Sequence, residues 1–197
     1  MAARSGMADL IETLRGMTDA GYDDYRVAGV PYWSDKHVQD FLDRHREDFV
    51  EEDLYAVQQT RNGTTYYLEY RSNYGNLEGV ASGTGVFKLD DAAGTNLGTS
   101  LWTADYNRGV VTFGNDTLGS TVLLTGRSYD LNAAAADVWR AKSAQAAKMY
   151  SFSAGGQSFT RDQYYRHCRE MMQYYEGLAK PTIISIYRGD NEKVSYD

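Results

Sequence analysis

The chain has 197 residues, 42% of them hydrophobic, which is typical of one domain or of one domain that carries a large insertion. Its formal net charge is −7. The acid is concentrated in residues 1–53, with thirteen acidic and six basic residues, whereas residues 128–180 hold five acidic and seven basic ones. A protein that grips nucleic acid through its phosphates needs a basic face, so tight DNA binding is not expected. The single cysteine, Cys168, excludes an intramolecular disulfide framework.

The start of the chain predicts neither a signal peptide nor a membrane span, because no apolar run is long enough for either. Residues 1–6 are expected to form a disordered arm. Tyrosine is unusually frequent, with 17 copies against 6 phenylalanines. This indicates either surfaces that become buried against partners or half-buried positions on strands, and the sequence favours neither.

Two helices are expected near the N-terminus. The first spans Met7–Met17, where apolar residues recur at helical spacing. The second begins after Ser34, a good N-cap residue, and is predicted to continue to about Phe49.

Residues 54–127 then change to the alternating pattern of strands and are expected to form a self-contained antiparallel β-unit of roughly five or six strands. The strongest local signal is Asn62-Gly63, because a type I′ hairpin turn needs positive φ at both positions. A second hairpin is expected around Asn107-Arg108-Gly109. The predicted strands are Leu54–Thr60, Thr64–Tyr70, Val86–Leu89, Leu101–Tyr106, Val110–Phe113 and Thr121–Arg127.

Helical character returns with the alanine-rich run Ala133–Tyr150 and with a second helix that follows a capping-box pattern at Thr160–Gln163 and ends before Pro181. The two helices are expected to pack as a long antiparallel hairpin. Its predicted packing residues are Val138, Trp139, Tyr150, Phe152, Phe159, Tyr164, Cys168, Met171 and Tyr175.

Beyond Pro181 the chain reads as an extended strand with large apolar groups on both faces. Such a segment is a liability if left free, so we expect it to add to the sheet of a partner. The alternative is that it folds back onto the chain's own β-unit. The residues of this predicted contact are Ile183, Ile184, Ile186 and Tyr187, with Arg188 at its boundary.

The fold class predicted is therefore α+β: a small helical bundle with a long antiparallel helix hairpin, an inserted antiparallel β-domain and an extended C-terminal tail. The bundle is expected to comprise residues 1–53 and 128–180, the insertion residues 54–127, and the tail residues 181–197.

No constellation typical of catalysis, metal binding or cofactor binding is recognisable. The three histidines are scattered, and His167 and Cys168 are adjacent on a helix, so they do not face each other. The glycine-rich run at 79–85 lacks the lysine and hydroxyl residue of a P-loop. The acidic run at 47–53 is more typical of a solvated face than of paired catalytic carboxylates. The sequence therefore predicts a non-enzyme that works by assembly, with no catalytic residue, metal or cofactor.

The segment LNAAAADVWRAKSAQAAKMYSFSAGGQSFTRDQYYRHCREMMQYYEGLA (131–179) resembles the helical hairpin of head–tail connector proteins of tailed bacteriophages, also called adaptor or head-completion proteins. The bend FSAGGQSF (152–159) and the opening segments LIETLRGMTDA and SDKHVQDFLDRHRED are also similar to that family. Together these segments cover about half of the chain. The β-unit departs from the simplest, purely helical members.

The resemblance implies a virion protein at the head–tail junction, assembled in the host cytoplasm as a homo-oligomeric ring of about twelve copies beneath the portal protein. It implies the portal and the next neck or tail protein as partners. The ring would extend the channel, through which DNA passes without specific binding, and no membrane is involved. In this family the C-terminal segment typically inserts into or augments the portal.

Two other functions remain open. One is another virion neck or tail component, such as a tail terminator. The other is a carbohydrate-binding module, which would bind glycans as an isolated monomer, whereas a connector would form rings with portal. The aromatic residues that suggest a glycan platform are Tyr66, Tyr67, Tyr70, Tyr74, Trp102 and Tyr106.

Overall fold

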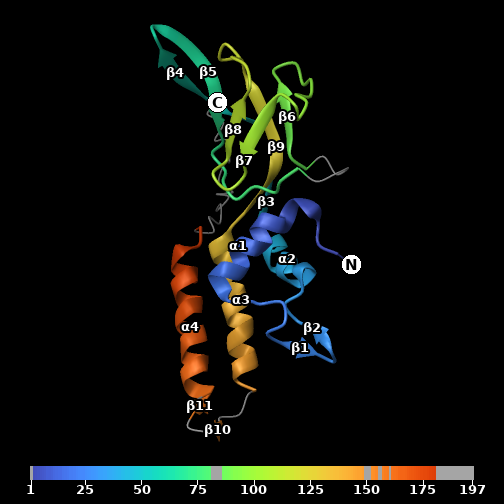
Figure 1. Cartoon of the computed structure of the whole chain (residues 1–197), viewed down its shortest axis with the longest axis vertical. Coiled ribbons are helices and arrows are strands. Elements are labelled where there is room, and N and C mark those ends of the chain that lie inside the picture. Colours follow the sequence, from blue (N-terminus) through green and yellow to red (C-terminus); the bar gives the residue numbers. More distant parts are fainter. Residues whose placement is uncertain (1, 81–85, 149–151, 155–156, 160, 181–197) are drawn as a thin grey trace, which may run out of the picture.

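The computed structural model describes residues 2–80, 86–148, 152–154, 157–159 and 161–180 (Figure 1). It has the mixed α+β composition that the sequence predicts, with helices and antiparallel sheets. The capping residue Thr160 and the predicted tail contact lie outside the described residues. That contact comprises Ile183, Ile184, Ile186, Tyr187 and Arg188.

The N-terminal part consists of a 3₁₀ turn at Ser5–Met7, the helix α1 at Ala8–Thr18, and the helix α2 at Asp35–Asp43. Between the helices lies a hairpin of two short strands, β1 (Arg26–Val27) and β2 (Val30–Pro31). The Ser34 side chain accepts a hydrogen bond from the His37 amide, which satisfies one of the unpaired N–H groups at the start of α2.

The prediction that the second helix continues to about Phe49 is wrong. Helix α2 ends at Asp43, and Arg46–Asp53 forms the strand β3, which pairs with the strand β9 (Val122–Tyr129). Within β3 only Phe49 is buried. A strand that buries one residue of eight has no clear alternation, so only its pairing with a distant strand identifies it. The β-unit therefore begins before residue 54 and ends after residue 127.

The β-unit has two sheets, and its remaining strands are β4 (Tyr55–Arg61), β5 (Thr64–Arg71), β6 (Lys88–Asp91), β7 (Trp102–Asp105) and β8 (Val110–Phe113). One sheet has the order β3-β9-β6 and the other the order β4-β5-β8-β7, with all pairs antiparallel. The β4–β5 turn is the one predicted, since Asn62 and Gly63 both have positive φ, 51° and 79°. Buried residues from both sheets form one cluster, which includes Tyr70, Leu89, Val111 and Leu124.

Two helices follow: α3 (Leu131–Ala146) and α4 (Arg161–Leu178), which lie side by side (Figure 1). Helix α3 starts at Leu131 because the Asp130 side chain accepts hydrogen bonds from the amides of Asn132 and Ala133. The short strands β10 (Phe152–Ala154) and β11 (Gln157–Phe159) pair between the two helices.

Within the described residues, most of the buried hydrophobic side chains belong to two clusters. One joins α1, α2 and α3 and includes Leu14, Trp33, Leu42 and Val138, and the other lies within the β-unit. Figure 1 shows the β-unit at one end of the long axis and the α3–α4 pair at the other. None of the helices in the described part of the chain is both long and apolar enough to cross a bilayer.

Candidate functional site

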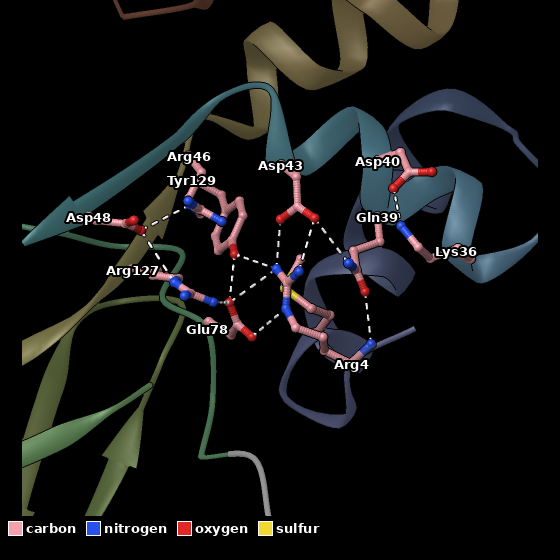
Figure 2. Close-up of polar contacts among 11 residues, drawn as sticks. Arg4, Lys36, Gln39, Asp40, Asp43, Arg46, Asp48, Glu78, Arg127 and Tyr129 are labelled. Atoms are coloured by element: carbon pink, nitrogen blue, oxygen red, sulfur yellow. Dashed lines mark hydrogen bonds and ion pairs between the residues drawn. The ribbon is translucent and has the colours of Figure 1, made fainter. Parts of the chain in front are cut away.

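A network of charged side chains joins the two parts of the molecule (Figure 2). Its centre is Arg4, whose guanidinium group donates to Asp43 at the end of α2 at 2.6 and 3.0 Å. The same guanidinium group donates at 2.8 Å to Glu78, which lies in the segment after β5. The backbone N–H of Arg4 donates to the side chain of Gln39. The prediction of a disordered arm over residues 1–6 is therefore wrong for Arg4, which is anchored on both parts.

Glu78 is the most deeply buried member of the network, with a fully inaccessible side chain. It accepts a hydrogen bond from the Tyr129 hydroxyl at 2.6 Å and lies 3.5 Å from the Arg127 guanidinium group (Figure 2). Two arginines and a phenol thus surround one buried carboxylate. A buried carboxylate is tolerable only when it is paired and hydrogen-bonded in this way.

The network shifts the pKa values of three of its members. Hydrogen bonding to Asp43 and Glu78 raises the pKa of Arg4, against the opposing effect of burial. Burial tends to raise the pKa of Asp43, but hydrogen bonds from Arg4 and Gln39 outweigh it, so the pKa of that carboxyl lies below its usual value. Burial and the hydrogen bond to Glu78 raise the pKa of Tyr129. All three groups therefore keep their neutral-pH protonation states, which suits a structural connection better than acid–base chemistry.

The backbone reinforces the same junction. The Gly79 N–H donates to the Gly6 carbonyl at 3.0 Å, and the Glu78 N–H donates to the Arg127 carbonyl at 2.9 Å. The sequence analysis identified none of this junction, because its members come from four separate segments. No pattern within any one segment marks Arg4 or Glu78 as a partner of the other.

The residues predicted to pack the α3–α4 hairpin differ in how deeply they are buried. Val138, Trp139 and Cys168 are buried, whereas Tyr164, Met171 and Tyr175 are half-buried. Trp139 Nε1 and the Tyr175 hydroxyl both donate to the Met17 carbonyl, at 3.3 and 3.1 Å, so both α3 and α4 contact the end of α1. Phe152 and Phe159 are partners in the backbone register of β10 and β11, and Tyr150 lies outside the described residues.

A cavity of about 350 Å³ lies beside Lys142. Pockets that bind small ligands usually measure about 300 to 1,000 Å³, so this cavity is at the small end of that range. The Lys142 ammonium group donates to the Asp19 carbonyl at 2.6 Å and lies 5.1 Å from the centre of the Trp139 ring. Burial lowers the pKa of Lys142, raises that of the Cys168 thiol, and raises that of Tyr164 to about 12. A buried thiol with a raised pKa is a poor nucleophile, in agreement with the interpretation of Cys168 as a core residue.

The histidines are separated. His37 packs among Tyr32, Trp33 and Phe41, and burial lowers its pKa. His45 Nε2 lies 2.9 Å from Asp137. Among the residues that the structure describes, no group of three or more histidine, cysteine, aspartate or glutamate side chains is arranged to hold a metal ion.

The aromatic residues that suggested a glycan platform belong largely to the β-unit core. Tyr70 and Trp102 are buried, and Tyr74 stacks on Phe49 with a ring separation of 4.3 Å. Tyr106 meets Phe87 edge-on at 5.1 Å. Tyr66 and Tyr67 are half-buried. Carbohydrate-binding platforms need exposed ring faces, so this packing removes the main feature that favoured a carbohydrate-binding module.

Among the described residues of the helical part, exposed apolar side chains include Val27 and Val30 on the β1–β2 hairpin and Tyr174 and Leu178 on α4. A large contiguous apolar patch indicates a surface that a partner covers, whereas single exposed apolar residues are ordinary. Helical spacing places Leu178 on the same apolar stripe of α4 as Cys168 and Tyr175, so the prediction that this stripe is buried is wrong for Leu178, which is 51% exposed.

In comparisons with known proteins, no family model, no curated protein and no solved structure matches the chain.

Proposed function

We propose that this chain is a structural virion protein that forms a ring of about twelve copies beneath the portal, joining a phage head to its neck or tail and extending the DNA channel. The outer face of α4 is the observation that carries the proposal. Helix α4 packs along α3, while Tyr174 and Leu178 remain 58% and 51% exposed. A two-helix pair with an uncovered apolar flank is suited to contacts with further copies.

The division of the molecule also supports assembly. The β-unit and the α3–α4 pair occupy opposite ends of the long axis (Figure 1). The chain can therefore contact different proteins at its two ends. A ring subunit in a neck needs such surfaces, because it must contact neighbours at its sides and other proteins above and below. The buried Arg4–Glu78 connection stabilises the relative arrangement of the two parts.

The distribution of charge fits a channel. Residues 1–53 carry thirteen acidic against six basic residues. In the proposed ring, DNA passes without specific binding because an acidic subunit repels phosphates. The predicted docking of residues 181–197 on the portal stays part of the proposal.

The test is electron microscopy of the purified chain, alone and mixed with the portal protein of the phage that encodes it. We expect end-on rings bound coaxially to the portal, with native mass spectrometry giving one dominant copy number. A stable closed dimer in both states would contradict the proposal. Rings that bind the tail tube and not the portal would instead support the tail-terminator alternative.

A further inference from the structure

The cavity beside Lys142 is built from three elements of the helical part. Asp19, which directly follows α1, lines it together with Lys142 on α3 and His167 on α4. These segments belong to one subunit, so the cavity exists without any partner. Its size is within the range of pockets that bind small molecules.

The buried end of the cavity carries two groups that can donate hydrogen bonds. Lys142 is 5% exposed, and its ammonium group donates to one acceptor of the described chain, the Asp19 carbonyl. An ammonium group has several N–H donors, and a lysine this deeply buried is normally paired with an acid. Lys142 forms no ion pair with any described residue.

Gln145 adds a second donor to the same end. It follows Lys142 by three residues on α3, so the two side chains are neighbours on the helix surface. Gln145 Nε2 is buried and has no hydrogen-bond partner in the described part of the chain. A buried donor without an acceptor costs free energy, so this end of the cavity is suited to a carboxylate, which accepts several hydrogen bonds.

Aromatic rings form the walls. The centre of the Trp139 ring lies 5.4 Å from that of His167, and the two rings meet edge-on. The Lys142 ammonium group lies 5.1 Å from the centre of the Trp139 ring and 5.8 Å from that of Trp33. Such walls suit a ligand that has a ring or another apolar group beside its charges.

The exposed end of the cavity is acidic. Asp19 and Asp24 both line it and are exposed. Asp24 accepts a hydrogen bond from the Gly21 N–H at 2.6 Å, and neither carboxylate forms an ion pair with a described residue. The neighbouring Asp23, in contrast, is paired with Arg26. The mouth of the cavity can therefore accept a cationic group.

The charges of the lining decide which class of ligand fits. An anion without a positive group would meet the carboxylates of Asp19 and Asp24, and a cation without a negative group would meet the Lys142 ammonium group. Like charges brought together are costly in a binding site. A ligand that carries both charges pairs with both ends of the cavity.

We propose that this cavity binds a small zwitterion with an aromatic side group, that is, a free aromatic amino acid. Its carboxylate accepts hydrogen bonds from Lys142 and Gln145, its ammonium group lies at Asp19 and Asp24, and its ring packs among the aromatic walls. The site lies within one subunit, so the inference is independent of the proposed ring.

The test is calorimetric titration of the full chain with four probes. Phenylalanine carries both charges and a ring, hydrocinnamate lacks the ammonium group, phenethylamine lacks the carboxylate, and glycine lacks the ring. We expect saturable binding of phenylalanine to one site, with each of the other three weaker by at least about 10-fold. No saturable binding of phenylalanine at millimolar concentration would overturn the proposal, and so would equal binding of either singly charged probe.

Two variants test the assigned contacts. Gln145→Met removes the unpartnered amide and keeps the length of the side chain, so we expect at least about 10-fold weaker binding of phenylalanine without a fall in melting temperature. A lower melting temperature with unchanged affinity would show that the amide serves the fold, and would overturn its role in binding.

Asp24→Asn removes a charge at the mouth and keeps an acceptor for the Gly21 N–H. We expect it to weaken the binding of phenylalanine but not that of hydrocinnamate, which has no ammonium group. Asp23→Asn is the matched control, because Asp23 is also exposed but does not line the cavity. Equal losses of phenylalanine affinity from the two substitutions would overturn the assigned contact.

Discussion

The β-unit and the helical part are built around different cores. In the β-unit, buried residues of two sheets form one cluster, so the aromatic residues Tyr70 and Trp102 are buried within a single subunit. In the helical part, α1 and α2 pack against α3, and α4 lies along α3. Both parts also expose large apolar side chains, among them Tyr55 and Leu118 on the β-unit and Tyr174 and Leu178 on α4.

Separate cores allow the two parts to respond differently to changes in the chain. Each core buries side chains from its own elements, so the loss of one part removes few contacts from the core of the other. The Arg4–Glu78 network is the polar connection between them.

The largest structural change is the removal of the β-unit, which tests whether the helical core folds without it. Arg46 and Tyr129 are direct partners at the start of β3 and the end of β9, so a two-residue Asn-Gly turn can replace residues 47–128. We expect this shortened chain to keep the core around Leu14 and Val138, because both residues lie outside the removed segment. Circular dichroism should show retained helix and a cooperative melt.

The matched control replaces residues 54–127, the boundaries that the sequence suggested. It leaves all of β3 in place but removes residues 122–127 of β9, so the acidic strand loses most of its partner. We expect this variant to be less stable and more prone to aggregate than the first. If both replacements abolish the cooperative melt, the two regions share one folding unit.

A smaller effect is expected from Glu78→Gln. The change leaves the shape of the side chain but removes the buried negative charge between Arg4 and Arg127, whose side chains are 28% and 29% exposed. We expect the free energy of unfolding to fall by about 2 to 3 kcal/mol, because one partner of a buried pair is lost.

Denaturant titration provides the measurement, with Asp48→Asn as its control. Asp48 also contacts Arg127 but is 51% exposed, so its removal should cost less than about 1 kcal/mol. An equal fall in the free energy of unfolding for both variants would show that the burial of Glu78 adds no stability to the junction beyond that of an exposed ion pair.

The smallest effect is expected from Asp43→Asn, and it depends on pH. Because the folded state holds the pKa of Asp43 below its usual value, its ionised form stabilises the fold above that usual value. This stabilisation is lost as the pH falls through the lowered pKa. The variant should therefore lose less than about 1 kcal/mol at neutral pH.

The acid limb of the stability curve provides the check. Unfolding measured between neutral pH and about pH 3 should show a shallower decline for Asp43→Asn than for the unsubstituted chain. Asp40→Asn is the matched control, since Asp40 lies on the same helix and pairs with Lys36 in an exposed position. A decline of unchanged slope for Asp43→Asn would contradict the assigned role of this carboxyl.

Local patterns predicted those elements whose signals lie within a short stretch. Apolar residues at helical spacing predicted α1, the alanine-rich run predicted α3, and Asn62-Gly63 predicted the β4–β5 turn, because each depends on backbone preferences of neighbouring residues. The strand β8 has the predicted bounds, Val110–Phe113. The α+β class follows from these elements together.

The sequence by itself thus determined the order of the four helices and the positions of the β4–β5 and β7–β8 hairpins, but not the short β1–β2 and β10–β11 hairpins. Only the tertiary structure decided how distant segments meet. From the sequence alone, the residues of β3 were predicted to end a helix and to continue as an acidic run, and only their pairing with β9 shows that they form a strand. Arg4 was predicted to lie in a disordered arm. In the structure its guanidinium group donates to Asp43 and Glu78, which are 39 and 74 residues away in the sequence. No local periodicity predicts such long-range pairings, because they depend on the burial and charge of two distant segments that come together only as the chain folds. The same reason hides the surfaces of α4 and the β1–β2 hairpin, since packing decides which apolar side chains stay exposed.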